Sequence, residues 1–271
     1  SFMCGILGAS FIEGAINPGR FADSLNLISH RGPDSTGSWF NDSKQDALGF
    51  KRLSILDLSD KGNQPFTSNC GQYKMVFNGE IYNFTNLKKL LIKENYIFHS
   101  NSDTEVLLHA YAAWGPECLQ KIEGMFAFAI YDSLKNTIFL ARDFAGQKPL
   151  YYSLKDGSLL FASELKSIIA LDPSLNSLNY LATFSYFHNG FMPNDSSIIS
   201  SIKKLPPAHA LFFDLKTRDY TIFDFHNLAK TINSKYKNRV RPAPEKIVLE
   251  MEKLLNKSVQ QQLIADVPIG V

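Results

Sequence analysis

The sequence predicts an α+β fold in which antiparallel β-hairpins alternate with amphipathic helices. Apolar, β-prone runs occur in pairs separated by short polar turns, at 124–132 with 137–142 and at 149–154 with 158–162. Elsewhere apolar residues recur at helical spacing. The 271 residues include 21 phenylalanines, which indicates a thick core between packed layers. The length suits one large domain or two ordinary ones.

Composition and charge exclude several classes of protein. Hydrophobic residues make up 45% of the chain and charged residues 20%, as in soluble globular proteins. A formal net charge of +2 gives no electrostatic reason to expect nucleic acid or a membrane surface as a partner. The longest apolar run, around 125–130, is too short to cross a bilayer. Cys4, Cys70 and Cys118 have neither metal-ligand spacing nor the even number of a disulfide framework, so we expect no metal and a reducing, cytoplasmic compartment.

The first element is expected to be a buried strand that begins around Cys4 and continues through an apolar run. If residues 1–3 are absent from the working protein, Cys4 carries both a thiol and a free α-amino group. Their ordinary pKa values are about 8.5 and about 7.7–8.0, so the amine can serve as a general base for the thiol. The alternative is a structural cysteine behind the remnant of a purification tag.

The next stretch predicts a helix, a loop and a strand. Residues 20–29 place apolar side chains on one face of a helix. Residues 30–37 are rich in Gly, Pro and Asp and read as a loop, and a helix C-cap followed by a turn accounts for its Gly and Pro. That interpretation leaves unexplained three closely spaced polar side chains, which are those of His30, Arg31 and Asp34. Residues 50–57 are predicted to form a strand with Arg52 within it or beside it.

Residues 73–83 hold two β-prone runs on either side of Asn78-Gly79, the dipeptide most typical of a tight hairpin turn. A helix is expected over 86–94. Ser102 and Glu105 match a capping box, in which Ser102 is the N-cap and Glu105 reaches back to it. The helix that they open is predicted to end at Gly115-Pro116.

The last third is expected to close one domain and begin another. Short helices are predicted at 163–170 and 178–187, the second closed by Asn189-Gly190, and a strand pair at 211–214 and 220–223. The polar, basic stretch 226–244 reads as a linker, and 245–265 as an amphipathic helix. These features predict a first domain over 4–225 and the truncated start of a second over 245–271.

Four sites could act together on an amino-acid amide. Asn78 and Gly79 could form an oxyanion hole for a carbonyl attacked by Cys4, or could simply make the turn. Arg52 could clamp a carboxylate with two hydrogen bonds, or could be an ordinary strand-edge arginine. Asp103 could receive an ammonium group, or could be a favourable carboxylate in the first turn of a helix. A thiol nucleophile, a carboxylate clamp and an ammonium acceptor together describe a site for glutamine.

A series of motifs, in order along the chain, closely resembles the glutaminase domain of glutamine-hydrolysing asparagine synthetases. That domain belongs to the class II, N-terminal-nucleophile (Ntn) amidotransferases. The resemblance covers about residues 3–215. Its motifs are Met3-Cys4-Gly5-Ile6, His30-Arg31-Gly32-Pro33-Asp34, Arg52-Leu53-Ser54-Ile55, Asn78-Gly79-Glu80-Ile81-Tyr82-Asn83, Ser102-Asp103-Thr104-Glu105, Gly124-Met125-Phe126-Ala127-Phe128-Ala129, Ala141-Arg142-Asp143, Lys148-Pro149-Leu150-Tyr151-Tyr152 and Phe161-Ala162-Ser163-Glu164-Leu165-Lys166.

The resemblance implies a four-layer αββα sandwich that hydrolyses glutamine to glutamate and ammonia without a cofactor. It implies that Cys4 is the nucleophile, its own α-amine the base, and Asn78 with Gly79 the oxyanion hole. Arg52 would bind the α-carboxylate of glutamine, and Asp103 with Gly79 its α-amino group. The remaining pocket residues that it implies are Leu53, Ser54, Ile55, Leu56 and Glu80.

The end of the chain resembles the strand that leads into the pyrophosphate loop of the ATP-dependent synthetase domain. The chain is therefore expected to stop before a site for ATP and Mg, in a protein whose own C-terminal half uses the ammonia to amidate aspartate or a related acid. A homodimer is compatible with the resemblance.

Three departures qualify these expectations. Residues 1–3 precede Cys4, so its α-amine is free only where they are absent. Residues 144–147 and 207–209 differ from the usual family runs and leave the acceptor open. A class II amidotransferase with another acceptor and a catalytically silent module of the same fold are the alternatives.

Overall fold

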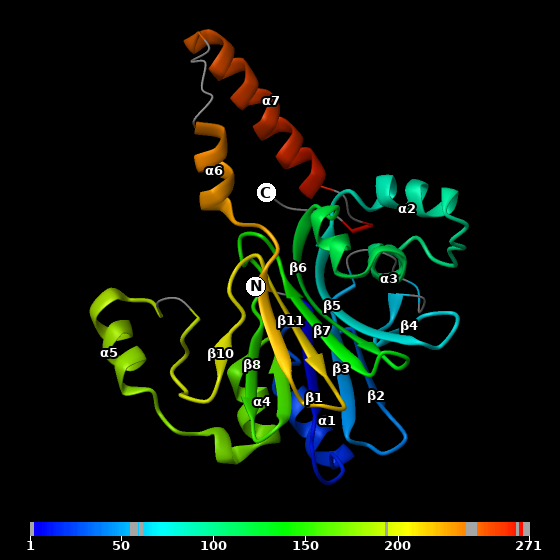
Figure 1. Cartoon of the computed structure of the whole chain (residues 1–271), viewed down its shortest axis with the longest axis vertical. Helices are drawn as coiled ribbons and strands as arrows, with labels where there is room; N and C mark the ends of the chain where they lie inside the picture. Colours follow the sequence, from blue (N-terminus) through cyan, green and yellow to red (C-terminus); the bar gives the residue numbers. More distant parts are fainter. Residues whose placement is uncertain are drawn as a thin grey trace.

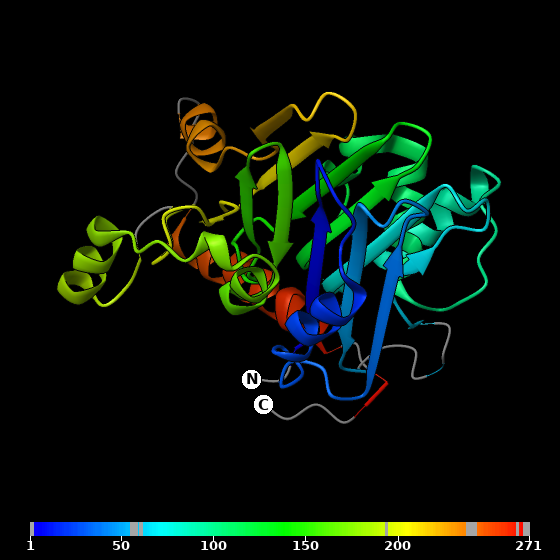
Figure 2. The same cartoon turned by 90° about the horizontal axis from the view of Figure 1, so that it is seen from below.

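Two antiparallel sheets lie face to face, and helices cover the outer face of each (Figures 1 and 2). The computed structural model describes residues 3–54, 59, 62–192, 195–236, 243–263 and 266–267. The layers follow the order helices, sheet, sheet, helices, with one apolar core between the sheets and one beneath each helical layer. The predicted α+β class and the αββα sandwich are therefore confirmed.

The first sheet has, among the described residues, six strands in the order β10-β8-β9-β1-β3-β2. Its central strand β1 is buried at every residue and pairs with β3 on one side and β9 on the other. The strands are β1 Gly5–Ser10, β2 Ser35–Phe40, β3 Asp46–Arg52, β8 Tyr151–Lys155, β9 Ser158–Ala162 and β10 Lys203–Lys204.

The second sheet follows the order β12-β11-β7-β6-β5-β4 in the described chain. Along its strand β6 the side chains alternate, as the pleat requires. Phe128 and Ile130 pack under the helices, whereas Ala127 and Ala129 face the other sheet. The strands are β4 Phe66–Thr67, β5 Tyr73–Ile81, β6 Gly124–Asp132, β7 Thr137–Arg142, β11 His209–Asp214 and β12 Tyr220–Asp224.

Two pairs of helices cover the sheets. Helices α1 (Pro18–Asn26) and α4 (Leu165–Leu171) pack on the first sheet, and α2 (Phe84–Lys93) and α3 (Asp103–Trp114) on the second. Short 3₁₀ turns follow at Gly115–Gln120 and Pro173–Leu175. The helix α5 (Tyr180–Asn189) projects from the sandwich and ends at Gly190, whose φ of 76° is the left-handed conformation predicted for this C-cap (Figure 1).

The hairpin predicted around Asn78-Gly79 is wrong, because β5 continues through both residues and pairs with β6 along its whole length. A side chain at position 79 would place its Cβ 2.1 Å from the carbonyl oxygen of Met125 on the neighbouring strand. The glycine therefore serves close approach of two strands rather than a turn. The pairing with β6 overrides the local preference of Asn-Gly for a turn.

Other boundaries also differ from expectation. The strand predicted over 50–57 begins earlier, as β3, and ends at Arg52, while residues 55–58 lie outside the described part of the chain. The loop predicted over 30–37 already contains the start of β2. Helix α6 (Leu228–Tyr236) lies within the stretch 226–244 that was predicted as a linker.

Helix α7 (Pro244–Gln262) stands apart from the sandwich (Figure 1). It has no buried residue, and its side-chain hydrogen bond to the sandwich runs from Gln261 Nε2 to Glu123 Oε2 at 3.1 Å. The division into a domain over 4–225 and a second one from 245 stays a prediction. No helix in the described ranges combines the length and apolar character needed to cross a membrane.

Candidate active site

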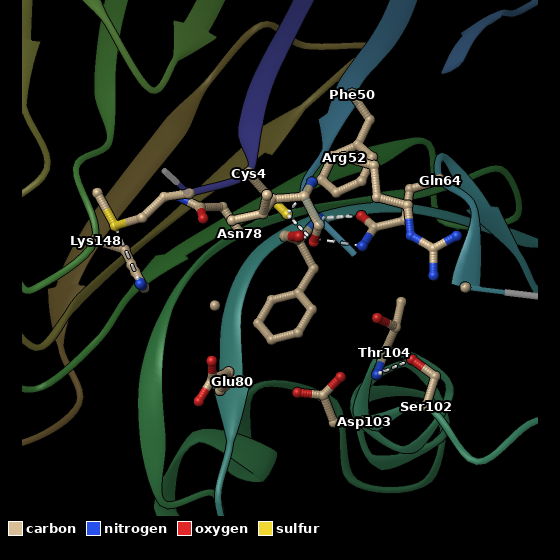
Figure 3. Close-up of a pocket in the computed structure, with 15 residues that line it drawn as sticks. Cys4, Phe50, Arg52, Gln64, Asn78, Glu80, Ser102, Asp103, Thr104 and Lys148 are labelled. Carbon is tan, nitrogen blue, oxygen red and sulfur yellow. Dashed lines mark hydrogen bonds between the residues drawn. The ribbon is translucent and has the colours of Figure 1, made fainter. Parts of the chain in front are cut away.

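At one end of the sandwich the apolar core between the sheets gives way to polar side chains. Side chains alternate along a strand, so Cys4 continues the inward row of Ile6, and Arg52 continues that of Phe50. Asn78 and Glu80 likewise follow Val76 of β5, whose side chain packs in the core between the sheets. These residues surround an open cavity (Figure 3).

The Cys4 side chain is held by the residue that follows β3. The backbone N–H of Leu53 donates to Cys4 Sγ at 3.3 Å, and Sγ lies 3.5 Å from the Leu53 carbonyl oxygen, to which the thiol can donate. Burial raises the pKa of the thiol, while the Leu53 N–H and the positive charges of Lys148 and Arg52 oppose that rise. These two contacts fix the position of the sulfur. Burial disfavours the thiolate, and the Leu53 N–H and the two positive charges offset part of that effect.

The loop that joins α1 to β2 anchors the backbone on both sides of Cys4. The N–H of Met3 donates to the carbonyl of Arg31 at 2.9 Å, and Arg31 Nε donates to the carbonyl of Cys4 at 3.0 Å. Arg31 and His30 both bind the carboxylate of Glu164, at 3.2 and 2.9 Å. Arg31 thus positions the start of β1 and shares its partner Glu164 with His30, whereas Asp34 accepts from the N–H of Ser54.

Asn78 presents a free donor to the cavity. It is only 1% exposed, and its Nδ2 has no hydrogen-bond partner among the described residues. An unpaired buried amide costs about 1–3 kcal/mol, so such a group calls for a functional reason. Asn78 and Cys4 line the same cavity, and an unpaired amide donor beside a nucleophile could bind the oxygen of an attacked carbonyl.

The open edge of β5 places one backbone donor beside Asn78. Gln64 bonds both the N–H and the C=O of Phe77 at this edge, at 2.6 and 3.1 Å. Two pairs further along, the carboxylate of Asp103 accepts from the N–H of Ile81 at 2.9 Å. Alternate residues of a strand address the same edge, so the N–H of Gly79 faces it between these two bonds, toward the cavity.

Arg52 closes another side of the cavity. Its Nη1 donates to the Ser59 carbonyl and to Asn63 Oδ1, both at 2.9 Å. These bonds hold the guanidinium at the cavity wall, where a carboxylate could accept from it.

Asp103 is the buried carboxylate of the cavity, with an exposed fraction of 4%. Burial raises its pKa to about 7, helped by the negative charge of Glu80, while the N–H of Ile81 lowers it. Burial also raises the pKa of Glu80. A carboxylate poised near neutral pH and deprived of water is well placed to take a cationic group of a ligand.

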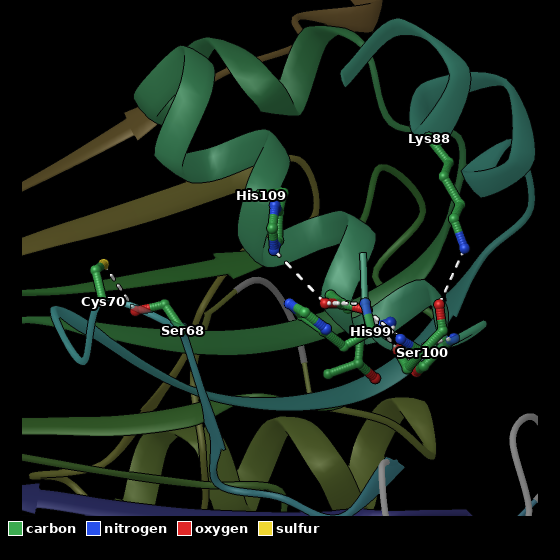
Figure 4. A network of polar contacts seen from close by, with 9 residues as sticks. Ser68, Cys70, Lys88, His99, Ser100 and His109 are labelled. Carbon is green, nitrogen blue, oxygen red and sulfur yellow. Dashed lines mark hydrogen bonds and ion pairs between the residues drawn. The ribbon is translucent and has the colours of Figure 1, made fainter. Parts of the chain in front are cut away.

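The first turn of α3 is fixed by the contacts of Glu105 with His99, Ser100 and His109, and these three partners are labelled in Figure 4. Ser102 Oγ accepts from the N–H of Thr104 at 3.1 Å, which confirms it as the N-cap. The capping-box prediction for Glu105 is wrong, because the carboxylate accepts from the N–H groups of His99 and Ser100, at 2.9 and 2.7 Å. Glu105 thereby holds the preceding loop, and this fixes where the helix presents Asp103.

The structure brings most of the predicted site residues together around one cavity: Cys4, Arg52, Leu53, Asn78, Gly79, Glu80 and Asp103. Ser54 does not line it, and its N–H instead donates to Asp34 Oδ2 at 2.7 Å. Ile55 and Leu56 lie outside the described residues. In the part of the chain that the structure describes, no group of three His, Cys, Asp or Glu side chains could hold a metal ion.

Sequence reasoning gave no site role to four polar residues of the cavity, Gln64, Ser102, Thr104 and Lys148. The Lys148 block was among the recognised motifs, but nothing local connected it with Cys4. Gln64 carried no signal at all, because its role depends on a strand edge that the sequence does not reveal.

Comparison with known proteins agrees with this geometry. A family model described as a glutamine amidotransferase domain matches residues 3–224. A putative asparagine synthetase [glutamine-hydrolyzing] 2 of Methanocaldococcus jannaschii is 36% identical over 288 residues, which cover 99% of this chain and 54% of that protein. Asparagine synthetase [glutamine-hydrolyzing] 3 of Bacillus subtilis is 33% identical over 275 residues, covering 98% and 42%. Amidase chry2 of Gibberella zeae is 34% identical over 255 residues, covering 92% and 36%.

The chain thus spans about half or less of the length of these relatives. Among solved structures, glutamine phosphoribosylpyrophosphate amidotransferase from B. subtilis, complexed with ADP and GMP, matches with a TM-score of 0.61. It is 19% identical, and the match covers 82% of this chain and 49% of that one. At that identity the likeness shows a shared fold.

Proposed function

Because the chain belongs to the family of glutamine amidotransferase domains, we propose that it hydrolyses glutamine to glutamate and ammonia, with Cys4 as the nucleophile. The observation that carries the proposal is the buried, unpartnered Asn78 amide, which shares a cavity with Cys4. The α-amine of Cys4 would be the base, and this requires a chain in which Cys4 is the first residue.

In the first half of the reaction, the α-amine takes the thiol proton and Cys4 Sγ attacks the side-chain amide carbon of glutamine. The carbonyl oxygen gains negative charge and accepts from Asn78 Nδ2 and the N–H of Gly79. The amine then returns the proton to the leaving nitrogen, so that ammonia departs and a thioester remains. In the second half water attacks the thioester, its proton passes through the same amine to the sulfur, and glutamate is released.

The remaining cavity residues would recognise the amino-acid end of glutamine. Arg52 would bind the α-carboxylate, and Asp103 with Gly79 the α-ammonium group. Leu53, Ile55, Leu56 and Glu80 would complete the pocket, as the family resemblance implies, whereas the N–H of Ser54 is bound by Asp34.

Replacement of Asn78 tests the oxyanion role. In a chain that begins at Cys4, Asn78→Ala should slow glutamate release by roughly 100-fold or more at saturating glutamine, because one oxyanion donor is lost. Labelling of Cys4 by a diazo-ketone glutamine analogue should first establish that the unsubstituted chain is active. A change of less than about threefold would remove Asn78 from the oxyanion hole, and a free Cys4 that resists labelling would overturn the enzyme assignment.

We further propose that the ammonia serves a C-terminal synthetase domain of the longer protein. The relatives named as asparagine synthetases support an acceptor such as aspartate, with ATP and Mg bound in that second domain. The similarity to amidase chry2 and the unusual residues 144–147 keep another carboxylate acceptor open. The three described cysteines are free thiols, which supports a cytoplasmic location.

A further inference from the structure

The loop between β7 and β8 is built around the buried Asp143 and the half-buried Arg142, and it places Lys148 at the cavity. Asp143 is fully buried and accepts from four backbone N–H groups at 2.9–3.2 Å, those of Phe126, Ala145, Gln147 and Lys148. Arg142 donates at 2.6–2.8 Å to three carbonyls, those of Gly146, Lys148 and Leu205. The backbone of Lys148 is therefore held at both its N–H and its C=O.

The Lys148 side chain is buried without a strong acceptor. The residue is 7% exposed, and among the described residues its Nζ donates to the thioether Sδ of Met3, at 3.2 Å. A thioether is a weak acceptor, and a buried ammonium with no better partner is costly. Lys148 and Glu80 both line the cavity, and in Figure 3 the Lys148 ammonium lies to the left of Cys4 and lower, with the Glu80 carboxylate below it. The buried charge of Lys148 therefore calls for a functional reason.

The position of Met3 connects Lys148 with the base of the reaction. The α-amine of Cys4 is free only where Met3 is absent, and the absence of Met3 also removes the thioether that Lys148 contacts. The ammonium lines the same cavity as Cys4, and its charge, which already acts on the Cys4 thiol, would then act on the new terminus. Two positive charges close together repel, so a protonated α-amine is disfavoured there.

We propose, resting on the proposed function, that Lys148 is a positioning residue of the glutaminase site. It keeps the α-amine of Cys4 in its neutral, proton-accepting form. The lysine does not itself touch the reacting atoms. It acts through the amine, which must be neutral to take the thiol proton.

The other charges around the terminus leave this effect in place. Arg52 and Arg31 are also positive, and Arg31 is paired with Glu164. The carboxylate of Asp143 points into its own loop, where it accepts the N–H groups named above. Burial lowers the pKa of Lys148, and Glu80 and Cys4 oppose that change. Of the charged groups near this part of the cavity, Lys148, Arg52, Glu80 and Asp103 line it, whereas Arg31 and Asp143 do not.

A pH profile distinguishes this role from simple packing. In chains that begin at Cys4, kcat for glutamate release at saturating glutamine is measured from pH 5.5 to 9. Lys148→Met, which keeps the length of the side chain but loses the charge, should move the acid limb of the profile upward by about one pH unit. Lys148→Arg should restore it. The matched control is Lys155→Met, a lysine that contacts Ser174 at 3.3 Å and lies outside the cavity; its profile should equal that of the parent.

A second measurement reads the amine without turnover. With ¹⁵N-labelled cysteine, Cys4 is the one labelled residue with a free α-amine, and its pKa can be titrated by NMR in each variant. An upward shift in Lys148→Met supports the proposal even if every chain lacks activity, which would then count against the proposed function alone. An unchanged amine pKa, or a loss of kcat that is equal at all pH values, would overturn the role of Lys148.

Discussion

Asp103 combines deep burial with a role that requires a negative charge. Its pKa lies at about 7 because burial disfavours the carboxylate. Binding of an ammonium group favours the charged form, so glutamine should bind mainly when Asp103 is ionised. The KM for glutamine is therefore expected to rise by up to about tenfold for each pH unit below 7 and to be nearly constant above it. Steady-state measurements from pH 5.5 to 8.5 check this.

Asp103→Asn provides the comparison, because it keeps an acceptor for the Ile81 N–H. Its KM should be higher at pH 8 and should lose the pH dependence. The folded-state pKa lies above the unfolded value of about 3.9, so the carboxylate lowers stability as the pH rises from about 4 to 7. The Asn variant should consequently melt at a higher temperature than the parent at pH 8, and at a similar one at pH 4. A KM that keeps its full pH dependence in Asp103→Asn would show that another group receives the ammonium.

Gln64 binds the backbone at the open edge of β5, next to Asn78. Its side chain takes both backbone bonds of Phe77, one residue before Asn78. Gln64→Leu leaves a buried N–H and C=O unpaired, which should cost about 1–3 kcal/mol of stability and let the edge of β5 shift. Below the melting temperature, kcat is expected to fall by roughly tenfold with little change in KM, since the hole serves the transition state.

Gln72→Leu is the matched control for that variant. Gln72 precedes the same strand and donates to Asp132 Oδ1 at 3.0 Å, at the end far from the cavity. It should lose stability without a specific loss of kcat. Equal kcat values for the two folded variants would show that Gln64 does not support the oxyanion hole.

Local patterns predicted most elements, and non-local partners decided the rest. β6 and β7 occur at the predicted bounds because apolar runs and a polar turn are local signals. The Asn78-Gly79 turn failed because the partner strand β6 lies more than forty residues away and outweighs the dipeptide's preference. Several site residues could be predicted from the chemistry of their side chains and from their place in a family motif. Lys148 and Gln64 acquire their positions only when distant loops meet, which spacing along the chain does not show.

Among the described residues the sandwich holds three apolar cores, and the C-terminal helix α7 adds no buried side chain to them. Helix α7 has no buried residue, so a chain that ends at Tyr236 should unfold within about 2 °C of the longer one, as expected for loss of surface contacts alone. Phe128→Ala is the opposite case: this side chain is fully buried under α3, and its loss should cost about 3–5 kcal/mol and lower the melting temperature by roughly 10 °C. Calorimetry on the parent, the shortened chain and Phe128→Ala measures these melting temperatures, and labelling of a free Cys4 checks that the site is intact. The comparison shows whether α7 contributes to the stability of the sandwich. If the shortened chain melts more than about 5 °C lower, α7 stabilises the sandwich, and the predicted boundary between the domains must move beyond it.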